Sequence, residues 1–445
     1  MSEKASRFIP MERKSSLIIR DVEKCVHCGS CLDICMKNKE SVTRYVQSDS
    51  TWNDSCVNCG QCIATCSEGA LSSRSYIDEV KKHIADTKKT VIFSISPAVQ
   101  AGLREAFKLD ADILCEGQII DALRHLGGDY VFDTGFSTDL SIIEEGTAFL
   151  MRLYEQKSLP VFTSRCPAFV KHMEREYPEK MVYLSSVKSP ISIQGATIKT
   201  YVAEQLDLDS ASIVNVIVTP CIAKKEEILR AELCDAGVFA GSNNIMDNDY
   251  VITTQELAEW IKSEKFDFKC LNTKAVYDNG MGRGSGAAVI SENSGGVTEA
   301  VLRMLYRVLT GEAEPEDLLA YKSLRGFSQV KGAEVVIKEL TLKVAVVYGL
   351  DAVNRLISGG YYKTFDFIEV MTCPGGCIGG AGQVNSNIKP DMKTLRKARM
   401  DTLYQRDEEM VLHNALDNDE IYTIYNNFYG FPLSALARQL LHTVR

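Results

Sequence analysis

Tryptophan and histidine are scarce in this sequence of 445 residues, which contains two Trp and six His. No stretch approaches the ~18 uninterrupted apolar residues of a membrane-spanning helix, and the first sixteen residues lack the apolar core of a secretory signal. Positive charge is not in excess either, because the formal net charge is −9. We therefore expect a cytoplasmic protein without a membrane span, and the negative charge argues against nucleic acid as a partner.

Cysteine, by contrast, is abundant, with 15 residues in the chain. A reducing compartment does not maintain disulfides, so cysteines in such number indicate metal ligands. The remaining composition is ordinary, at 45% hydrophobic and 24% charged. The length allows two to four domains of roughly 100–200 residues each.

Eight of the cysteines form two copies of the spacing C-x2-C-x2-C-x3-C. Bacterial two-cluster ferredoxins have this run, and the fourth cysteine of each run binds the other cluster. Structural zinc is the alternative, which the repetition of three close thiols plus a fourth at fixed offset disfavours. We predict two [4Fe-4S] clusters, one bound by Cys25, Cys28, Cys31 and Cys66 and the other by Cys56, Cys59, Cys62 and Cys35.

A second cysteine site is centred on residues 369–383, where Cys373 and Cys377 lie among five glycines. Glycines allow backbone to approach a bulky cofactor closely. A zinc hook requires a second pair of thiols nearby, which is missing, so further ligands must come from elsewhere. Cys166 and Cys221 are the candidates, because each ends an apolar, strand-like run just before an expected helix, and α/β folds build sites at strand ends.

The three segments resemble the signatures of the catalytic domain of the [FeFe]-hydrogenases, which read roughly TSCCP, PCxxKxxE and ExMxCxxGCxxGG. The resemblance extends from about residue 91 to the C-terminus. It implies that Cys166, Cys221, Cys373 and Cys377 hold the cubane of the H-cluster. Cys377 would bridge to a two-iron subsite with CO, cyanide and a dithiolate. The implied substrates are H2 and protons, and the implied partners are ferredoxin or a signalling redox protein and maturation proteins for the two-iron subsite; the oligomeric state stays open.

We predict four segments: a tail (1–19), an α+β ferredoxin-like domain (20–87), an α/β two-lobed H-cluster domain (88–392) and a helical, small-subunit-like wrap (393–445). Short apolar strands alternate with helical patterns, which indicates mostly parallel sheets covered on both faces. The strands are expected near residues 91–95, 130–134, 161–163, 214–219, 273–277, 343–348 and 367–371. Basic residues near the first cysteine run, including Arg20 and Lys24, form either a patch for an acidic partner or a solvated tail.

The resemblance also implies residues that contact the cofactor. Lys224 matches PCxxKxxE, and its ammonium would donate to a cyanide ligand; Met371 matches the third signature. Glu227 would pair with Lys224, although both could instead be exposed residues of a helix. The remaining cofactor-binding candidates are Ser96, Pro97 and Ala98 after the first strand, and Ser285 and Gly286 in a turn resembling the GSGA loop of the family.

Proton transfer is where the sequence departs from the family. Catalytic members use the first cysteine of TSCCP as the acid–base group, and Arg165 occupies this position. Arginine stays protonated and cannot exchange protons. Glu145 and Ser185 match the next two groups of the relay, but Ala148 replaces its second glutamate. The standard relay is therefore interrupted twice.

Three interpretations follow. The first is a slow, sensory or otherwise divergent hydrogenase whose electrons leave through the ferredoxin-like clusters. The second is an efficient ferredoxin-linked hydrogenase with another proton path, which Arg165 disfavours. The third is a non-catalytic iron–sulfur protein without the two-iron subsite, like the cytosolic cluster-assembly relatives of hydrogenases, which can share the lysine motif.

Overall fold

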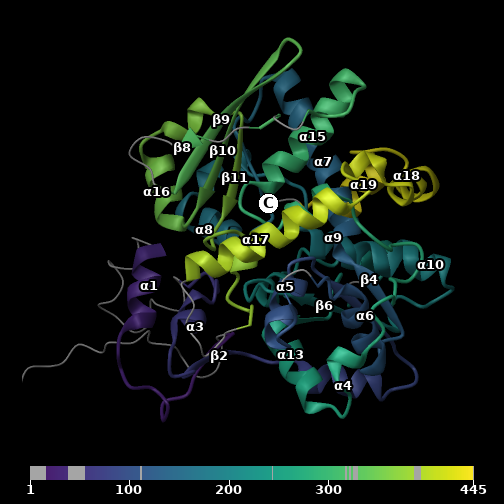
Figure 1. The fold of residues 1–445 in the computed structure, drawn as a ribbon. Helices are drawn as coiled ribbons and strands as arrows, with labels where there is room; N and C mark the ends of the chain where they lie inside the picture. The colour runs from purple at the N-terminus through teal and green to yellow at the C-terminus, as the bar shows by residue number, and fades with distance from the viewer. Residues whose placement is uncertain are drawn as a thin grey trace, which may run out of the picture.

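The computed structural model describes residues 17–38, 56–110, 113–242, 244–315, 318–319, 322–323, 329–384 and 392–443. Two lobes, each built on one sheet, make up most of the molecule (Figure 1). A smaller N-terminal part, purple in Figure 1, lies beside them. The first sixteen residues, with most of the predicted basic patch, lie outside the described ranges.

The first lobe contains a parallel four-stranded sheet in the order β4 (Tyr130–Asp133), β3 (Thr90–Ile95), β6 (Ile213–Thr219) and β7 (Tyr250–Thr253). All seven residues of β6 are buried, as expected for a parallel strand covered on both faces. The adjoining helices are α4 (Ile77–Ile84), α5 (Val99–Ala106), α6 (Glu116–His125) and α13 (Thr254–Ser263).

The second lobe contains a mixed sheet in the order β5 (Val161–Phe162), β11 (Phe367–Met371), β10 (Leu340–Tyr348), β9 (Val330–Ile337) and β8 (Lys322–Ser323). The first three strands are parallel, whereas β9 is antiparallel to both β10 and β8. Around this sheet lie α7 (Thr134–Glu155), α15 (Gly296–Thr310), α8 (Pro167–Glu176) and α16 (Leu350–Ser358).

The largest hydrophobic core joins the two lobes. It combines Ile92 and Phe132 from the first sheet with Val344 and Phe367 from the second. Alternate residues of the second sheet, such as Ala345, face a separate core. The shared core fixes the two sheets relative to each other and therefore fixes the strand ends that meet between them.

The remaining helices are short, apart from the 18-residue α17 (Met392–Glu409), which lies across both lobes (Figure 1). Arg399 on α17 pairs with Glu105 of the first lobe, and Asp407 pairs with Arg303 of the second. The other elements are β1 (Ile18–Arg20), α1 (Ser30–Asn38), α3 (Gln61–Thr65), β2 (Leu71–Ser73), η2 (Pro178–Tyr183), α9 (Pro190–Thr197), η3 (Ile198–Val202), α10 (Ala203–Gln205), α11 (Lys224–Glu227), α12 (Asp235–Phe239), η4 (Phe268–Cys270), α14 (Gly286–Ile290), η5 (Tyr361–Thr364), η6 (Cys377–Gly379), η7 (Ala415–Asp417), α18 (Asp419–Ile424), η8 (Tyr425–Tyr429) and α19 (Ala435–Leu441).

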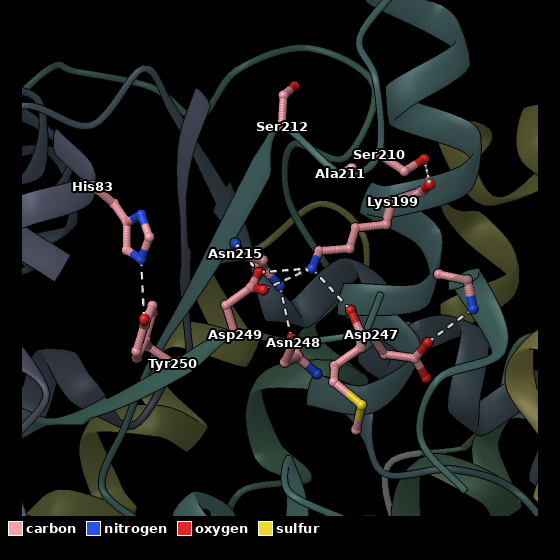
Figure 2. A network of polar contacts seen from close by, with 12 residues as sticks. His83, Lys199, Ser210, Ala211, Ser212, Asn215, Asp247, Asn248, Asp249 and Tyr250 are labelled. Atoms are coloured by element: carbon pink, nitrogen blue, oxygen red, sulfur yellow. Dashed lines mark hydrogen bonds and ion pairs between the residues drawn. The ribbon is translucent and has the colours of Figure 1, made fainter. Parts of the chain in front are cut away.

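A polar network fixes the segment before β7 (Figure 2). Lys199, almost fully buried in the π-helical turn η3, donates to Asp249, which also accepts from the backbone N–H of Asn215. Asp247 accepts at 2.8 Å from Lys188, a lysine without exposed side-chain surface. Buried lysines require such partners, and these pairs hold the start of α9 in place.

The predicted fold class is confirmed: an α/β body with mostly parallel sheets follows a small cysteine-rich part with an antiparallel β1–β2 pair. The predicted strand at residues 273–277 is wrong, since the segment forms turns and coil. Strands β7 and β9 were not predicted, and the C-terminal region is helical as expected. Within the described ranges, no helix is both long and apolar enough to cross a membrane.

Candidate active site

A cavity with about 620 Å³ of space free of protein atoms, part of it open to solvent, lies where strands of both sheets end. Ser96 follows β3, Cys166 follows β5, Cys221 follows β6, and Met371 ends β11; all four residues border the cavity. The carboxyl ends of parallel strands are the usual place for a site in α/β proteins.

The four candidate cysteines all border this cavity. Cys166 precedes α8, whose first residue is a proline, and Cys377 begins the 3-10 turn η6. The cysteine loop is held by Glu369, which is fully buried in β11 and accepts from the backbone N–H groups of Gly295 and Thr298 at the start of α15. This contact explains why a glutamate precedes the cysteine pair.

Burial controls the charge of these thiols. It raises the pKa of Cys221 to about 12 and raises the pKa of Cys373 and Cys377 well above the ordinary value. The neighbouring thiols reinforce the effect, because a like charge disfavours ionisation. A cationic metal centre would be needed to hold them together as thiolates.

The arrangement does not suit a single metal ion. A zinc ion binds ligand atoms at about 2.0–2.3 Å, which brings all of them close together. Within the described ranges, no three His, Cys, Asp or Glu side chains are grouped tightly enough for one ion. A four-iron cluster binds each cysteine at a separate iron, so its ligands are spaced more widely.

Helix α11 presents Lys224 to the cavity. Its ammonium donates to Glu227 and to Ser189, each at 3.2 Å. Burial lowers the pKa of Lys224, but the charges of Glu227, Cys221 and Cys377 outweigh burial and leave the pKa raised. Lys224 is therefore a charged donor at the cavity wall, and the interpretation as an exposed lysine is wrong, since only 6% of it is exposed.

Arg165 also borders the cavity and is buried. Its Nη2 donates to Ser141 Oγ at 2.5 Å, and Ser141 lies one helical turn of α7 before Glu145. Within the part of the chain that the structure describes, the Nε of Arg165 has no hydrogen-bond partner. Burial lowers the pKa of Arg165, and Glu145, Glu369 and Cys377 oppose this shift. The guanidinium thus lies at the cavity wall next to α7, on the side of Glu145.

Glu145 and Ser185 do not border this cavity but meet at a second one, of about 720 Å³, together with Ala148 and Arg152. Burial raises the pKa of Glu145, and the hydrogen bond with Ser185 opposes the shift. Arg152 and Glu155, which also line the second cavity, are partly exposed. The small side chain of Ala148 leaves room for water at this position.

Glu292 was not predicted from the sequence as a site residue. This half-buried carboxyl borders the main cavity and accepts from the backbone N–H of Ala98, while its buried Oε2 has no hydrogen-bond partner among the described residues. Burial raises its pKa to about 7, whereas Lys224 and Arg165 oppose the shift. The available signal was an acid directly after Ser291, at the end of an apolar run that the Gly-rich turn places near the site.

Three family matches cover most of the chain. Residues 89–381 match the iron only hydrogenase large subunit, C-terminal domain; residues 393–444 match the iron hydrogenase small subunit; and residues 17–70 match a 4Fe-4S dicluster domain. Iron hydrogenase 1 of Clostridium pasteurianum is 38% identical over 97% of this chain and 76% of its own length. The chain belongs to the iron-only, or [FeFe]-, hydrogenase family.

A solved structure and a second curated protein are also similar to this chain. The structure of [FeFe]-hydrogenase HydA1 from Chlamydomonas reinhardtii matches with a TM-score of 0.72 and 32% identity, over 83% of this chain and 98% of that one. The cytosolic Fe-S cluster assembly factor narfl of Danio rerio is 28% identical over 81% of this chain and 88% of its own length. The sequence similarity therefore extends to a relative whose name describes cluster assembly.

The family and the dicluster domain establish the cofactors as [4Fe-4S] clusters and an H-cluster. In the ferredoxin-like part, a cavity of about 420 Å³ is lined by the four cysteines predicted for one cluster: Cys25, Cys28, Cys31 and Cys66. The thiol of Cys62 lies near those of Cys59, Cys56 and Cys35, which are its predicted partners in the other cluster, and also near Cys31. The ligand sets remain predictions that this grouping supports.

The other candidate cofactor residues divide into two groups. Ser96, Lys224 and Met371 border the hydrogenase cavity, whereas Pro97, Ala98, Ser285 and Gly286 do not. Ser285 caps α14 and bonds Asp139 through its N–H and its hydroxyl, at 2.7 and 2.6 Å. A Cβ on Gly286 would lie 1.8 Å from Asp407, so this loop is shaped by its packing against α17. The assignment of Ser285 and Gly286 as cofactor-binding residues therefore stays a prediction.

The residues around the cavity fit an H-cluster. Four thiols border a space that extends to Lys224, and the Nε donor of Arg165 is buried there with no hydrogen-bond partner among the described residues. A buried polar atom without a partner is costly. Polar ligands on a two-iron subsite would supply an acceptor for this donor beyond the cubane.

Proposed function

We propose that this chain interconverts H2 with two protons and two electrons at an H-cluster, slowly, and that it acts in hydrogen sensing or regulation. The observation that carries the proposal is the place of Arg165 between the main cavity and α7, hydrogen-bonded to Ser141 and near Glu145. A group there that cannot release its proton would limit exchange between the cavity and the relay carboxyl.

The bound H-cluster would supply the iron that binds H2 and the electronic coupling for its cleavage. Cys166, Cys221, Cys373 and Cys377 would hold its cubane, and Lys224 would donate to a polar ligand of the two-iron subsite. Met371 and Ser96 complete the wall and exclude water. Glu145 and Ser185 would carry protons between the second cavity and the side of Arg165 that faces α7.

Electrons would enter or leave through the ferredoxin-like clusters, with ferredoxin or a signalling redox protein as partner. Cys28 is exposed, and Cys59 interacts electrostatically with Cys166 and Cys221. The first cluster therefore faces solvent and the second faces the H-cluster site. Maturation proteins would install the two-iron subsite, and a cytoplasmic location remains part of the proposal.

Two other functions have specific support. Glu292 gives the cavity a carboxyl of its own, which favours an efficient hydrogenase with a different proton path. The similarity to the narfl assembly factor favours a non-catalytic iron–sulfur protein. Against the latter, a two-iron subsite would supply an acceptor for the buried Nε of Arg165, which has no hydrogen-bond partner among the described residues.

Infrared spectroscopy in the CO and cyanide stretching region tests the proposal. Protein matured with the two-iron subsite is exposed to H2 and then to argon. Bands that shift reversibly with H2, together with slow turnover, support the proposed function. The same bands with rapid turnover support the efficient enzyme, and the absence of bands despite iron for three cubanes supports the assembly or electron-transfer function.

A further inference from the structure

One side chain of the ferredoxin-like part reaches directly into the H-cluster site. Gln61, the first residue of α3, lies between the predicted cluster ligands Cys59 and Cys62 and is buried. Its amide nitrogen donates to Cys373 Sγ at 3.2 Å and to the backbone carbonyl of Gly379 at 3.1 Å. Both N–H groups of the amide are therefore directed at the cysteine loop of the other site.

The two parts of the molecule approach closely at this point. Gly60 has φ +72°, and a Cβ there would lie 2.5 Å from Ile222 and 3.0 Å from Ala381. Only glycine allows this approach without strain. The close approach of the Gly60 backbone to these two side chains explains how a side chain as short as glutamine spans the interface.

Helix α11 holds the interface in position. Lys224 and Glu227 pair at the cavity, whereas Lys225 and Glu226 contact the ferredoxin-like part. Glu226 accepts from the amide of Asn58 at 2.8 Å. The four consecutive residues Lys224–Glu227 thus connect the H-cluster site to the ferredoxin-like part. The contacts of Lys225 and Glu226 therefore help the hydrogen bonds of Gln61 to hold this residue in position.

A donor at a cluster ligand changes the reduction potential. Reduction adds negative charge to an iron–sulfur cluster and its thiolates, and an N–H donor stabilises the more negative state more strongly. Hydrogen bonds to the sulfurs are among the factors that set cluster potentials. The Gln61 amide at Cys373 should therefore raise the reduction potential of the cluster that Cys373 binds.

We propose that Gln61 is a positioning residue of the electron relay that raises the reduction potential of the four-iron cluster bound by Cys166, Cys221, Cys373 and Cys377. The effect makes electron transfer toward this cluster more favourable than it would be with an apolar side chain at this position. The inference rests only on the cubane half of the proposed function. It stands or falls independently of the two-iron subsite.

The test is an EPR-monitored redox titration of the full chain, loaded with three cubanes but without the two-iron subsite. We expect Gln61→Leu to move one of three midpoint potentials to a lower value, by about 59 mV, which corresponds to about tenfold in a one-electron equilibrium. Gln61→Glu, which keeps the shape but removes the donor, serves if the leucine variant does not assemble its clusters, and should move the same potential in the same direction.

Two control variants assign the shift. Ser30 Oγ lies 3.4 Å from Cys28 Sγ, so Ser30→Ala should move a different midpoint potential. Glu226→Ala removes the contact with Asn58 without touching Cys373 and should leave the potential that responds to Gln61 in place. Three unchanged potentials in both Gln61 variants would overturn the proposal, as would a shift of the same size in Glu226→Ala.

Discussion

The guanidinium of Arg165 stands where a thiol would connect the cavity to Glu145. We predict that Arg165→Cys raises the rate of H2 evolution at least tenfold, within the roughly 10²–10⁴-fold that a positioned acid–base group contributes. Ala148 does not need to change, because the second cavity brings solvent to Glu145. The measurement is H2 evolution from protein whose infrared bands show complete maturation.

Arg165→Ala is the matched control, since it removes the same charge and opens the same space without adding a thiol. The cysteine variant should exceed the alanine variant. Equal rates in the two, or no increase over the parent in fully matured cysteine protein, would show that the missing thiol does not limit turnover.

Glu292 offers the cavity a carboxylate oxygen that has no hydrogen-bond partner among the residues that the structure describes. Geometry is the first requirement for a general acid or base, and this side chain borders the cavity together with Lys224 and Arg165. We predict that Glu292→Gln lowers H2 turnover about tenfold while the CO and cyanide bands remain. Glu227 contacts the cavity residue Lys224 and does not border the cavity itself, so Glu227→Gln should lower H2 turnover less. A parent-like rate in the Glu292 variant would exclude a proton path through this carboxyl.

At the residue scale, ligands were easier to predict than acid–base groups. Cysteine spacing is a strong signal because an iron–sulfur cluster requires thiols, so all four candidates for the second site are found at one cavity. Glu292 carried no such signal, because a single glutamate in a sequence is normally exposed. Ser285 caps a helix, and the sequence alone does not separate this role from cofactor binding because a helix cap and a ligand-binding turn have the same composition.

At the scale of elements, α11 joins two functions within one helical turn. Lys225 has no exposed side-chain surface, and its ammonium bonds Glu256 at 2.6 and 2.8 Å and Ser73 at 3.1 Å. Burial lowers the pKa of Lys225, and Glu256 opposes that shift. The pair therefore holds β2 of the ferredoxin-like part against α13.

We predict that Lys225→Met weakens the contact between β2 and α13. Breaking a buried ion pair leaves the charge of Glu256 without a partner, at a free-energy cost of about 3 kcal/mol or more. Hydrogen exchange of the β2 amides should accelerate roughly 100-fold if the contact opens locally. Lys171→Met is the control, since the Lys171–Glu226 pair is partly exposed and worth about 1 kcal/mol at most. Equal protection in parent and Lys225→Met protein would contradict the role of α11.

The strands that could be predicted from their hydrophobic pattern were those that are fully buried. β11 was predicted at its observed position, and the core of β6 and β10 was found, because fully apolar runs favour buried strands. β9 alternates buried and exposed residues and contains Gly332, so its pattern is weaker. The segment 273–277 was short and polar at its start, and contacts with α6 keep it in turns.

At the scale of the whole molecule, the cysteines form a series from the surface to the cavity. Cys28 is exposed, Cys62 is buried between the two runs, and Cys59 interacts with Cys166 and Cys221 of the H-cluster site. Sequence spacing indicates two clusters but not which one is nearer the third. That order depends on the packing of α3 against the H-cluster domain, which only the tertiary structure specifies.

The order can be tested by removing one ligand from each run. We predict that Cys66→Ser alters the cluster at the surface, because Cys66 lines the same cavity as Cys25, Cys28 and Cys31. Cys35→Ser should alter the inner cluster instead, since Cys35 lies near Cys62. In EPR spectra of reduced protein, magnetic coupling to the H-cluster cubane should weaken in Cys35→Ser and persist in Cys66→Ser. If each fourth cysteine served its own run, the two results would be exchanged, and the relay would have to be redrawn with Cys35 in the outer cluster.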